Sequence, residues 1–318
     1  MMSKTPWIVS KRDDLTFFIG SAAIGYTLMA IALANGALPV ALAALIAVLI
    51  DGPHVYSTAT RILLDRDEFR RQRFILLFIV PLCLVGPLLI LSVGFQTFFI
   101  VIVAWGQYHI SKQHMGFVLL YKRKANERED FKLDKYFTLG SLLLPYLYFV
   151  SAMITGTTKY LAIFLIPGLI FATYYIRHQS AKENKNLPKL VLLTAFIPLH
   201  WLAWAYAAQS PHSPSRVLVA AVTVNIGHSF QYLRLMWFHN NNRYQNRSGI
   251  LGILSRKWLY FVGAAVLLAS PEQIAKFAHN ELLSYALLGF LMLHYVVDSR
   301  IWRVRGDFEL AQALKLTA

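Results

Sequence analysis

The chain contains a single cysteine, Cys83, among its 318 residues. One thiol excludes an internal disulfide and a zinc cage built from several thiolates. Charged residues are also scarce, at 15% of the sequence, whereas apolar residues make up 57%. This balance is typical of a polytopic membrane protein and not of a soluble domain. Any metal that the chain binds must therefore be held by nitrogen and oxygen ligands.

Acidic residues are the scarcer charged class, with 16 Asp and Glu against 31 Lys and Arg. A net charge of +15 is found in proteins that bind nucleic acids, but here the basic residues lie in short segments between apolar runs. Such segments orient a membrane protein, because Lys and Arg are retained on the cytosolic side. We therefore expect no nucleic-acid partner.

Ten apolar segments have about the 20 residues that a membrane-spanning helix needs. They are residues 15–34, 37–58, 74–93, 95–121, 136–154, 160–175, 190–208, 217–238, 258–270 and 282–301. With this count, every basic residue except Lys159, Arg216 and Lys276 lies on one side of the membrane. The sequence predicts an all-α bundle of about ten spans with both termini in the cytosol.

The sequence gives no sign of a soluble domain, so residues 1–318 are expected to form a single integral membrane domain. Residues 1–14 precede a full-length apolar segment without a clear cleavage site, which predicts a cytosolic tail and not a removable signal. We expect the protein in the cytoplasmic (inner) membrane of a bacterium, surrounded by membrane lipids.

Four of the even-numbered segments contain a histidine a short way before a basic patch. These residues are His54, His109, His228 and His294. Their segments run in the same direction, so the imidazoles are expected at similar depth, roughly 18 to 26 Å from the outer ends of the helices. Ionisable groups are costly in lipid and mark functional sites. The pattern predicts that the four imidazoles converge on a buried metal.

Two further residues are candidate ligands. Asp298 follows His294 by four positions, on the same helix face, and is expected to be a ligand or a base. His114 follows His109 by five positions, about 140° around the helix, and is a secondary candidate. Imidazole and carboxylate ligands suit iron, zinc, copper or manganese, and non-haem iron with open positions suits oxygen chemistry. Iron is the expected metal.

Four polar residues near the histidines are expected to assist the chemistry. Asp51, Gln113 and Gln231 lie on the histidine faces of their helices and would orient imidazoles or bound oxygen. Lys112 would place a positive charge near a developing anion. The histidine boxes of membrane desaturases (HxxxH and HxxHH), the P-loop and the HExxH motif are all absent.

The same residues support other interpretations. Two histidines could be axial ligands of a haem, which would be noncovalent because the sequence has no CxxCH motif. The polar helix faces could instead line the path of a proton- or ion-coupled transporter, a function also suggested by the helix-breaking pair Gly52-Pro53. A membrane histidine can also simply hydrogen-bond a neighbouring helix, which is the expected role of His200. Four arginines are either interfacial anchors or binders of an anionic headgroup: Arg61, Arg234, Arg300 and Arg303.

The motif residues resemble those of a family of uncharacterised bacterial polytopic membrane proteins. They are Asp51 to His54 with Arg61, Tyr108 to Phe117, Gly227 to Tyr232, and His294 to Asp298 with Ile301 to Arg303. In general layout the chain also resembles the membrane carotenoid-cleaving dioxygenases of the Brp/Blh type, although their two histidines one turn apart have no counterpart here. That resemblance implies a histidine-ligated iron and a polyene substrate. The sequence thus predicts an iron-dependent oxygenase or related oxidoreductase that acts on a lipophilic substrate and needs an electron donor.

Overall fold

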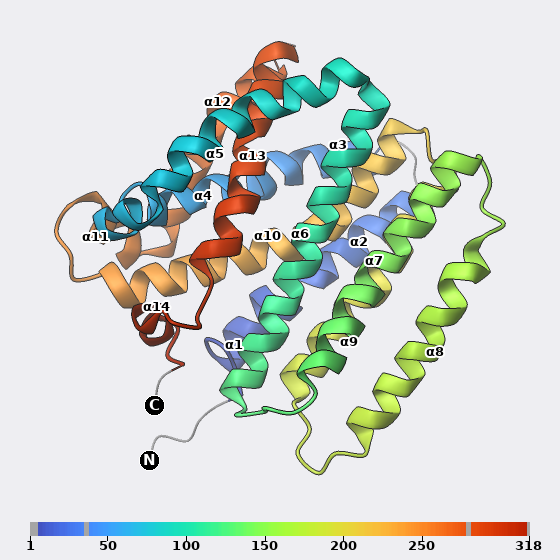
Figure 1. Ribbon diagram of the computed structural model, residues 1–318, viewed down its shortest axis with the longest axis horizontal. Coiled ribbons are helices and arrows are strands. Elements are labelled where there is room, and N and C mark those ends of the chain that lie inside the picture. The colour runs from blue at the N-terminus through green and yellow to red at the C-terminus, as the bar shows by residue number, and fades with distance from the viewer. Residues whose placement is uncertain (1–5, 35–37, 278–280, 317–318) are drawn as a thin grey trace. The chain divides into compact units, whose positions relative to one another are not determined.

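The computed structural model describes residues 6–34, 38–277 and 281–316, and these residues form helices and no strand. The all-α prediction is confirmed. In chain order the elements are α1 (Lys11–Asp13), the π-helix η1 (Asp14–Ile19), α2 (Ser21–Ala34), α3 (Leu38–Ile46), the π-helix η2 (Ala47–Asp51), α4 (Gly52–Ile62), α5 (Arg66–Val93), α6 (Phe95–Lys124), α7 (Phe131–Thr155), α8 (Leu161–Ser180), α9 (Leu187–Ala208), α10 (Pro214–Tyr244), α11 (Gly249–Arg256), α12 (Trp258–Phe277), α13 (Glu281–Ile301) and α14 (Phe308–Ala313) (Figure 1).

Several helices are long and apolar enough to cross a membrane, as expected of a multi-span membrane protein. Six such spans occur among the described residues: Lys11–Ala34, Leu38–Ile62, Arg66–Val93, Phe131–Thr155, Leu161–Ser180 and Leu187–Ala208. The pair Gly249–Arg256 and Trp258–Ile274, bent by 117°, would be a seventh. The count of ten spans and the cytosolic termini stay predictions, and the first five residues of the expected N-terminal tail lie outside the described residues.

The chain divides into two compact units. Unit 1 consists of residues 1–46 and 105–231, and unit 2 consists of residues 47–104 and 232–318. The helices α6 and α10 are each continuous across a boundary in the sequence, so each contributes residues to both units. Whether the chain acts as the single domain expected from its sequence stays a prediction.

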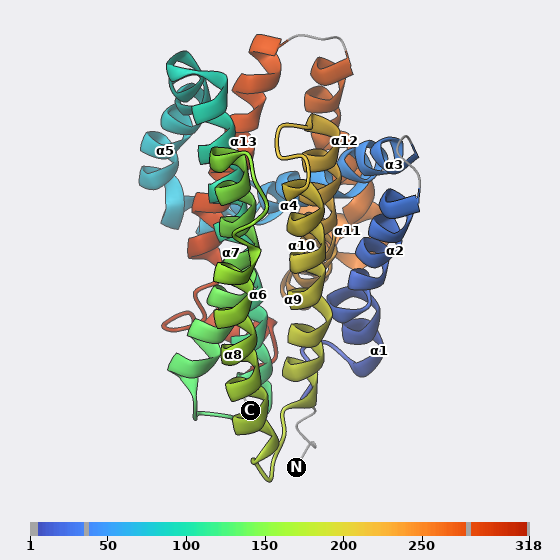
Figure 2. The same cartoon turned by 90° about the vertical axis from the view of Figure 1, so that its right-hand side faces the viewer.

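Unit 1 is built around α9. Helix α7 packs against both α8 and α9, and α2 packs against α9 (Figures 1 and 2). Helix α9 begins where the Asn186 side chain accepts a hydrogen bond from the Lys189 amide, and Pro188 fills the first turn, where no amide donor is needed. In the core, the rings of Phe149 and Trp204 lie 5.0 Å apart.

Unit 2 pairs α5 with α13 and α4 with α12 (Figure 1). Its hydrophobic core consists of Ile62, Tyr232, Leu233, Met236, Phe261, Val297 and Ile301. Asp65 caps the start of α5, because its carboxylate accepts a hydrogen bond from the Asp67 amide at 3.1 Å. This packing fixes the faces that α4, α10 and α13 turn toward one another within the unit.

The helix-breaking pair Gly52-Pro53 does not end its span. Residues Ala47–Asp51 form the π-helix η2, and α4 continues directly from Gly52. Proline has no amide to donate to the carbonyl four residues earlier, and its ring crowds that carbonyl. A locally widened helix relieves both problems, and π-helical turns of this kind occur often at functional sites. The irregular segment lies immediately before His54.

Candidate metal centre

Unit 2 brings two of the four motif histidines together. The rings of His54 on α4 and His294 on α13 have centroids 5.0 Å apart and meet at 88°. Both residues are buried, with 1% and 2% of their surface exposed. A ring nitrogen of each lies within 4.8 Å of the other. Two nitrogens on opposite sides of one ion are about 4.2 Å apart, given metal–nitrogen bonds of about 2.1 Å, so a small ring movement allows shared coordination.

The Nδ1 atom of each ring is held by a neighbouring polar group. His294 Nδ1 lies 2.8 Å from the Thr58 hydroxyl, which in turn lies 2.8 Å from the Tyr232 hydroxyl. His54 Nδ1 lies 3.2 Å from the Asp51 carboxylate and also contacts the Asp51 carbonyl. Metal-binding histidines usually use one ring nitrogen for such a contact and the other for the metal. In both rings the nitrogen that would bind a metal is therefore Nε2.

Asp298 is the carboxylate nearest to this pair along α13. It lies one turn after His294, is 9% exposed, and is placed for a side-chain hydrogen bond with Tyr232. Tyr232 therefore contacts both Asp298 and Thr58. Two imidazoles with one carboxylate make up the ligand set of many non-haem iron enzymes. The side chains of unit 2 are thus of the types that bind non-haem iron. The role of Asp298 as a ligand stays a prediction.

Unit 1 brings the other two motif histidines together. The rings of His109 on α6 and His228 on α10 have centroids 4.9 Å apart at 81°, and both residues are buried. Gly227 allows α10 to approach α9 closely at this level, because a Cβ at this position would lie 2.0 Å from a ring carbon of Phe196. The sequence therefore places a glycine next to His228 for a steric reason.

Three of the expected assisting residues lie in unit 1. Gln113 donates a hydrogen bond to the His228 carbonyl at 2.9 Å, and Gln231 donates to the Phe18 carbonyl at 2.7 Å. Both amides thus hold the backbone, and neither bond is made to an imidazole. Lys112 is exposed. Its role beside a developing anion stays a prediction.

His114 pairs with a histidine that the motifs did not include. Its ring lies 5.7 Å from that of His200 and 4.5 Å from that of Phe196, between α6 and α9. Gln107 donates a hydrogen bond to His200 Nδ1 at 3.2 Å, which is the role expected of His200. Neither ring nitrogen of His114 has a hydrogen-bond partner among the described residues. His114 as a metal ligand stays a prediction.

Arg61 differs from the other arginines near the motifs. It is fully buried in unit 2, lies 3.7 Å from the Glu68 carboxylate, and has its guanidinium carbon 5.0 Å from the Trp302 ring centre. An interfacial anchor keeps its charged end in water, so complete burial argues against that role for Arg61. Arg303, in contrast, is exposed.

We compared the chain with family models, curated proteins and solved structures, and none of them matches it. The likeness to the Brp/Blh-type dioxygenases and to the uncharacterised bacterial family therefore stays a prediction.

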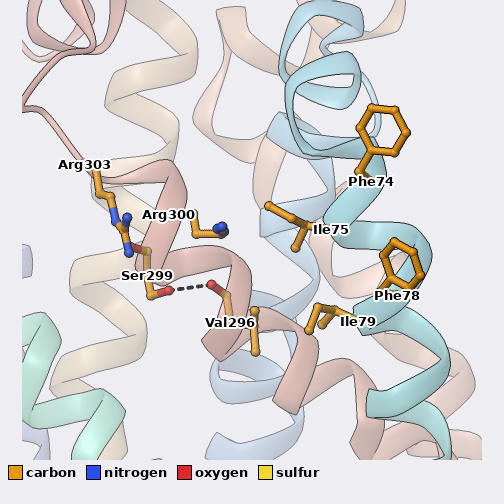
Figure 3. Close-up of a pocket in the computed structure, with 8 residues that line it drawn as sticks. All are labelled: Phe74, Ile75, Phe78, Ile79, Val296, Ser299, Arg300 and Arg303. Carbon is orange, nitrogen blue, oxygen red and sulfur yellow. Dashed lines mark hydrogen bonds between the residues drawn. The ribbon is translucent and has the colours of Figure 1, made fainter.

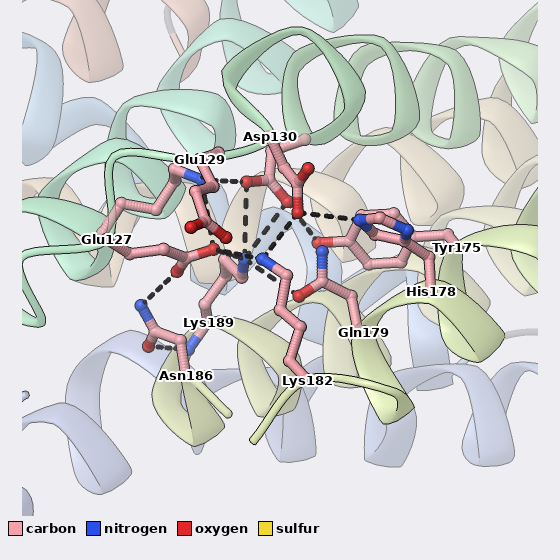
Figure 4. Close-up of polar contacts among 11 residues, drawn as sticks. Glu127, Glu129, Asp130, Tyr175, His178, Gln179, Lys182, Asn186 and Lys189 are labelled. Carbon is pink, nitrogen blue, oxygen red and sulfur yellow. Dashed lines mark hydrogen bonds and ion pairs between the residues drawn. The ribbon is translucent and has the colours of Figure 1, made fainter. Parts of the chain in front are cut away.

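A polar cluster in unit 1 was not anticipated from the sequence (Figure 4). Lys189 Nζ lies 2.7 Å from Glu127 Oε1 and 3.2 Å from Asp134 Oδ1, and the Tyr175 hydroxyl donates to Asp134 at 2.6 Å. Lys122 also contacts Asp134. These groups come from α6, α7, α8, α9 and the α6–α7 connection, so the cluster ties four helices together.

The charges of this cluster compensate one another. Burial by itself raises the pKa of Glu127, but hydrogen bonds from Lys189 and Asn186 outweigh it and hold that pKa at about 2. The pKa of Asp130 is likewise lowered, because burial is outweighed by contacts with Lys182 and His178. Glu127, Asp130 and Asp134 thus each face a cation, which indicates a structural clamp and not a metal site.

Proposed function

We propose that the protein is a membrane-embedded oxidoreductase that depends on a transition metal and acts on a lipophilic substrate such as a lipid or polyene. Non-haem iron is the metal we favour. The observation that carries this proposal is the buried pair His54 and His294, whose Nδ1 atoms are both held by neighbouring polar groups. Buried imidazoles so oriented in an apolar helix bundle are well suited to bind a metal and poorly explained by packing alone.

The residues of unit 2 divide the work as follows. His54 and His294 would hold the metal through Nε2, with Asp298 as a third ligand or a base. Asp51 and Thr58 fix the imidazole orientations. When bound, non-haem iron supplies redox chemistry with oxygen that the side chains lack.

The Tyr232 hydroxyl provides a link for protons. It lies 2.8 Å from Thr58 Oγ1 and is placed for a hydrogen bond with Asp298. With Nε2 on the metal, His294 Nδ1 would carry a proton and donate to the Thr58 hydroxyl, which would donate to Tyr232 and through it to the Asp298 carboxylate. Asp298 would thus be the group at the end of this chain that can take up a proton. An oxidoreductase that takes up protons with electrons needs such a connection, and an external donor would supply the electrons.

His109 and His228 would provide further imidazole ligands in unit 1. Their rings are as close as those of the unit 2 pair, and they too are buried. The proposal therefore requires both pairs for full metal content. It places the protein in the bacterial cytoplasmic membrane, where a lipophilic substrate can reach a buried centre from the bilayer.

Elemental analysis together with an optical spectrum of the purified protein tests this function. We expect about one or two equivalents of iron or a related transition metal per chain, and oxygen consumption that depends on an added electron donor and a lipophilic substrate. Protein purified without stoichiometric metal after growth in iron-rich medium, and unable to take it up in vitro, would overturn the proposal.

The same experiment separates the two rival functions. An intense Soret band would decide for haem, with two of the four motif histidines as its axial ligands. Metal-free protein that moves protons or ions across liposomes would decide for a transporter.

A further inference from the structure

A groove of about 460 Å³ lies between α5 and α13 on the surface of unit 2 (Figure 3). Its walls consist of Phe74, Ile75, Phe78 and Ile79 from α5, and Val296, Ser299 and Arg300 from α13, with Arg303 two residues after the end of that helix. Figure 3 shows Arg303 and Phe74 at one end of the groove and Val296 and Ile79 at the other. The groove is therefore apolar along its length and basic at one end.

The two helices that form this groove, α5 and α13, are in close contact beyond its apolar end, at Cys83 and Gly289. A Cβ on Gly289 would lie 2.3 Å from the Cys83 carbonyl oxygen, so the two backbones are in contact there. Arg300 is eleven positions further along α13, which corresponds to roughly 16 Å. This length is about half of the roughly 30 Å hydrocarbon core of a bilayer. The seam between α5 and α13, from this contact to the basic end of the groove, thus has about the length of a single leaflet.

The basic end of the groove lacks acidic partners. The Arg300 side chain forms no hydrogen bond or ion pair with any residue in the part of the chain that the structure describes. Arg303 donates from Nε to the Ser299 carbonyl at 2.9 Å, which leaves its charge uncompensated. None of the eight lining residues is acidic. Two guanidinium groups at the rim of an apolar groove are suited to a phosphate, which they can bind through paired hydrogen bonds.

The apolar wall is exposed to the surroundings. Phe74 and Phe78 have 65% and 72% of their surface exposed, and the Arg73 guanidinium lies 4.8 Å from the Phe74 ring centre. In a membrane these side chains face acyl chains. The groove can therefore contact both parts of a lipid, the headgroup at its basic end and an acyl chain along its apolar wall.

The groove is separate from the candidate metal centre. Ser299 and Arg300 follow His294 by five and six positions, which places them about 140° and 240° around the axis of α13. One face of α13 therefore carries His294 and Asp298, and the opposite face borders the groove. A ligand in the groove does not depend on the chemistry proposed for the histidines.

We propose that this groove binds an anionic phospholipid. The phosphate lies between Arg300 and Arg303, and one acyl chain follows Phe78 and Ile79 toward the point where α5 and α13 touch. The positive charge of the two arginines and the apolar wall support this proposal. Because the arginines have no acidic partner of their own, the site favours anionic over zwitterionic lipids.

Native mass spectrometry of the full chain, taken from vesicles of equal parts phosphatidylglycerol and phosphatidylcholine, tests the proposal. Wild-type protein is expected to retain phosphatidylglycerol selectively. The double variant Arg300→Gln/Arg303→Gln is expected to bind it about 30-fold more weakly, at about a tenfold change for each 1.4 kcal/mol and about 1 kcal/mol for each arginine near the membrane surface. The control Arg128→Gln/Arg177→Gln removes two exposed charges in unit 1 and should leave retention unchanged.

A second measurement guards against loss of the fold. Phosphatidylglycerol should raise the melting temperature of wild-type protein in phosphatidylcholine micelles, but not that of the double variant, because a ligand stabilises only the state that binds it. If the double variant fails to fold, the single variants replace it. Equal retention of both lipids by wild type, an equal loss in the unit 1 control, or a second copy of the chain in place of lipid would each overturn the proposal.

Discussion

The Thr58 hydroxyl lies 2.8 Å from His294 Nδ1, although 236 positions separate the two residues in the sequence. The same hydroxyl lies 2.8 Å from the hydroxyl of Tyr232. Helices α4, α10 and α13 thus meet at one side chain inside unit 2. Because a hydrogen bond at Nδ1 fixes both the tautomer and the ring orientation, Thr58 determines how His294 presents Nε2.

Replacing Thr58 with valine removes the hydroxyl and keeps the shape of the side chain. We expect Thr58→Val to bind metal about 10- to 100-fold more weakly, because loss of a partner that orients a ligand has this effect. Competition with a chelator of known affinity measures the change. Thr173→Val, which removes a hydroxyl from the exposed face of α8, is the matched control. Equal affinities in the two variants would contradict the role assigned to Thr58.

Gly227 is expected to tolerate no side chain. A Cβ there would lie 2.0 Å from a ring carbon of Phe196, so Gly227→Ala should lower the free energy of unfolding by about 1–3 kcal/mol or more. Adding Phe196→Leu should recover part of the loss, because the smaller side chain makes room for the methyl group. Thermal unfolding of the two single variants and the double variant measures the coupling. Additive losses would show that the two residues do not collide.

Lys189 is fully buried and faces Asp134, which is also buried. Removing the Lys189 charge leaves Lys122 as the remaining cation at Asp134 and gives the buried cluster an excess negative charge, so Lys189→Met should cost about 3–5 kcal/mol of unfolding free energy. The double variant Lys189→Met/Asp134→Asn should be more stable than Lys189→Met alone, since it leaves no unpaired charge. Denaturation of the purified protein checks both. A near-neutral Lys189→Met would show that the cluster does not clamp the helices.

Glu127 makes the stability of unit 1 depend on pH. Its pKa is about 2 in the folded protein, against an ordinary value of 4.5. A carboxyl with a lowered pKa stabilises the fold above its ordinary pKa, and this contribution is lost as the pH falls through the folded value.

The difference in melting temperature between wild type and Glu127→Gln reports this contribution. We expect it to be constant from pH 7 down to about 4.5 and to shrink steadily as the pH falls toward 2. Glu129→Gln, at an exposed position of the same connection, should give no comparable difference. A difference that grows as the pH falls would have the wrong sign for this account.

The sequence predicted what depends on local composition. Apolar length located the helices, and the spacing of four placed Asp298 one turn after His294. The spacing of three between Asp51 and His54 likewise corresponds to a contact of 3.2 Å. These features arise within one helix, where the geometry follows from sequence position alone.

The sequence could not predict which helices are neighbours. The apolar residues of a membrane helix surround it on all sides, so hydropathy gives no preferred face for packing. The pairing of His54 with His294 and of His109 with His228 therefore needed the structure. Thr58 carries no sequence signal at all, because a hydroxyl in an apolar helix most often bonds to its own backbone.

The cluster around Lys189 was missed for a different reason. Lys189 and Asp134 lie just outside the apolar segments, and charges there are normally solvated or interfacial. In the structure, α9 begins before Lys189 and α7 begins before Asp134, so both charges lie inside helices. A basic and an acidic residue at the same ends of neighbouring segments is the signal that could have indicated the contact.

The central claim is that His54 and His294 hold one metal ion. Metal content per chain, measured on wild type, His54→Ala, His294→Ala and the exposed control His212→Ala, tests it most directly. The account predicts about one or two equivalents in wild type and the control, and a loss of at least one equivalent in each of the other two variants. Equal metal content in all four proteins, or no metal in any of them, would contradict it.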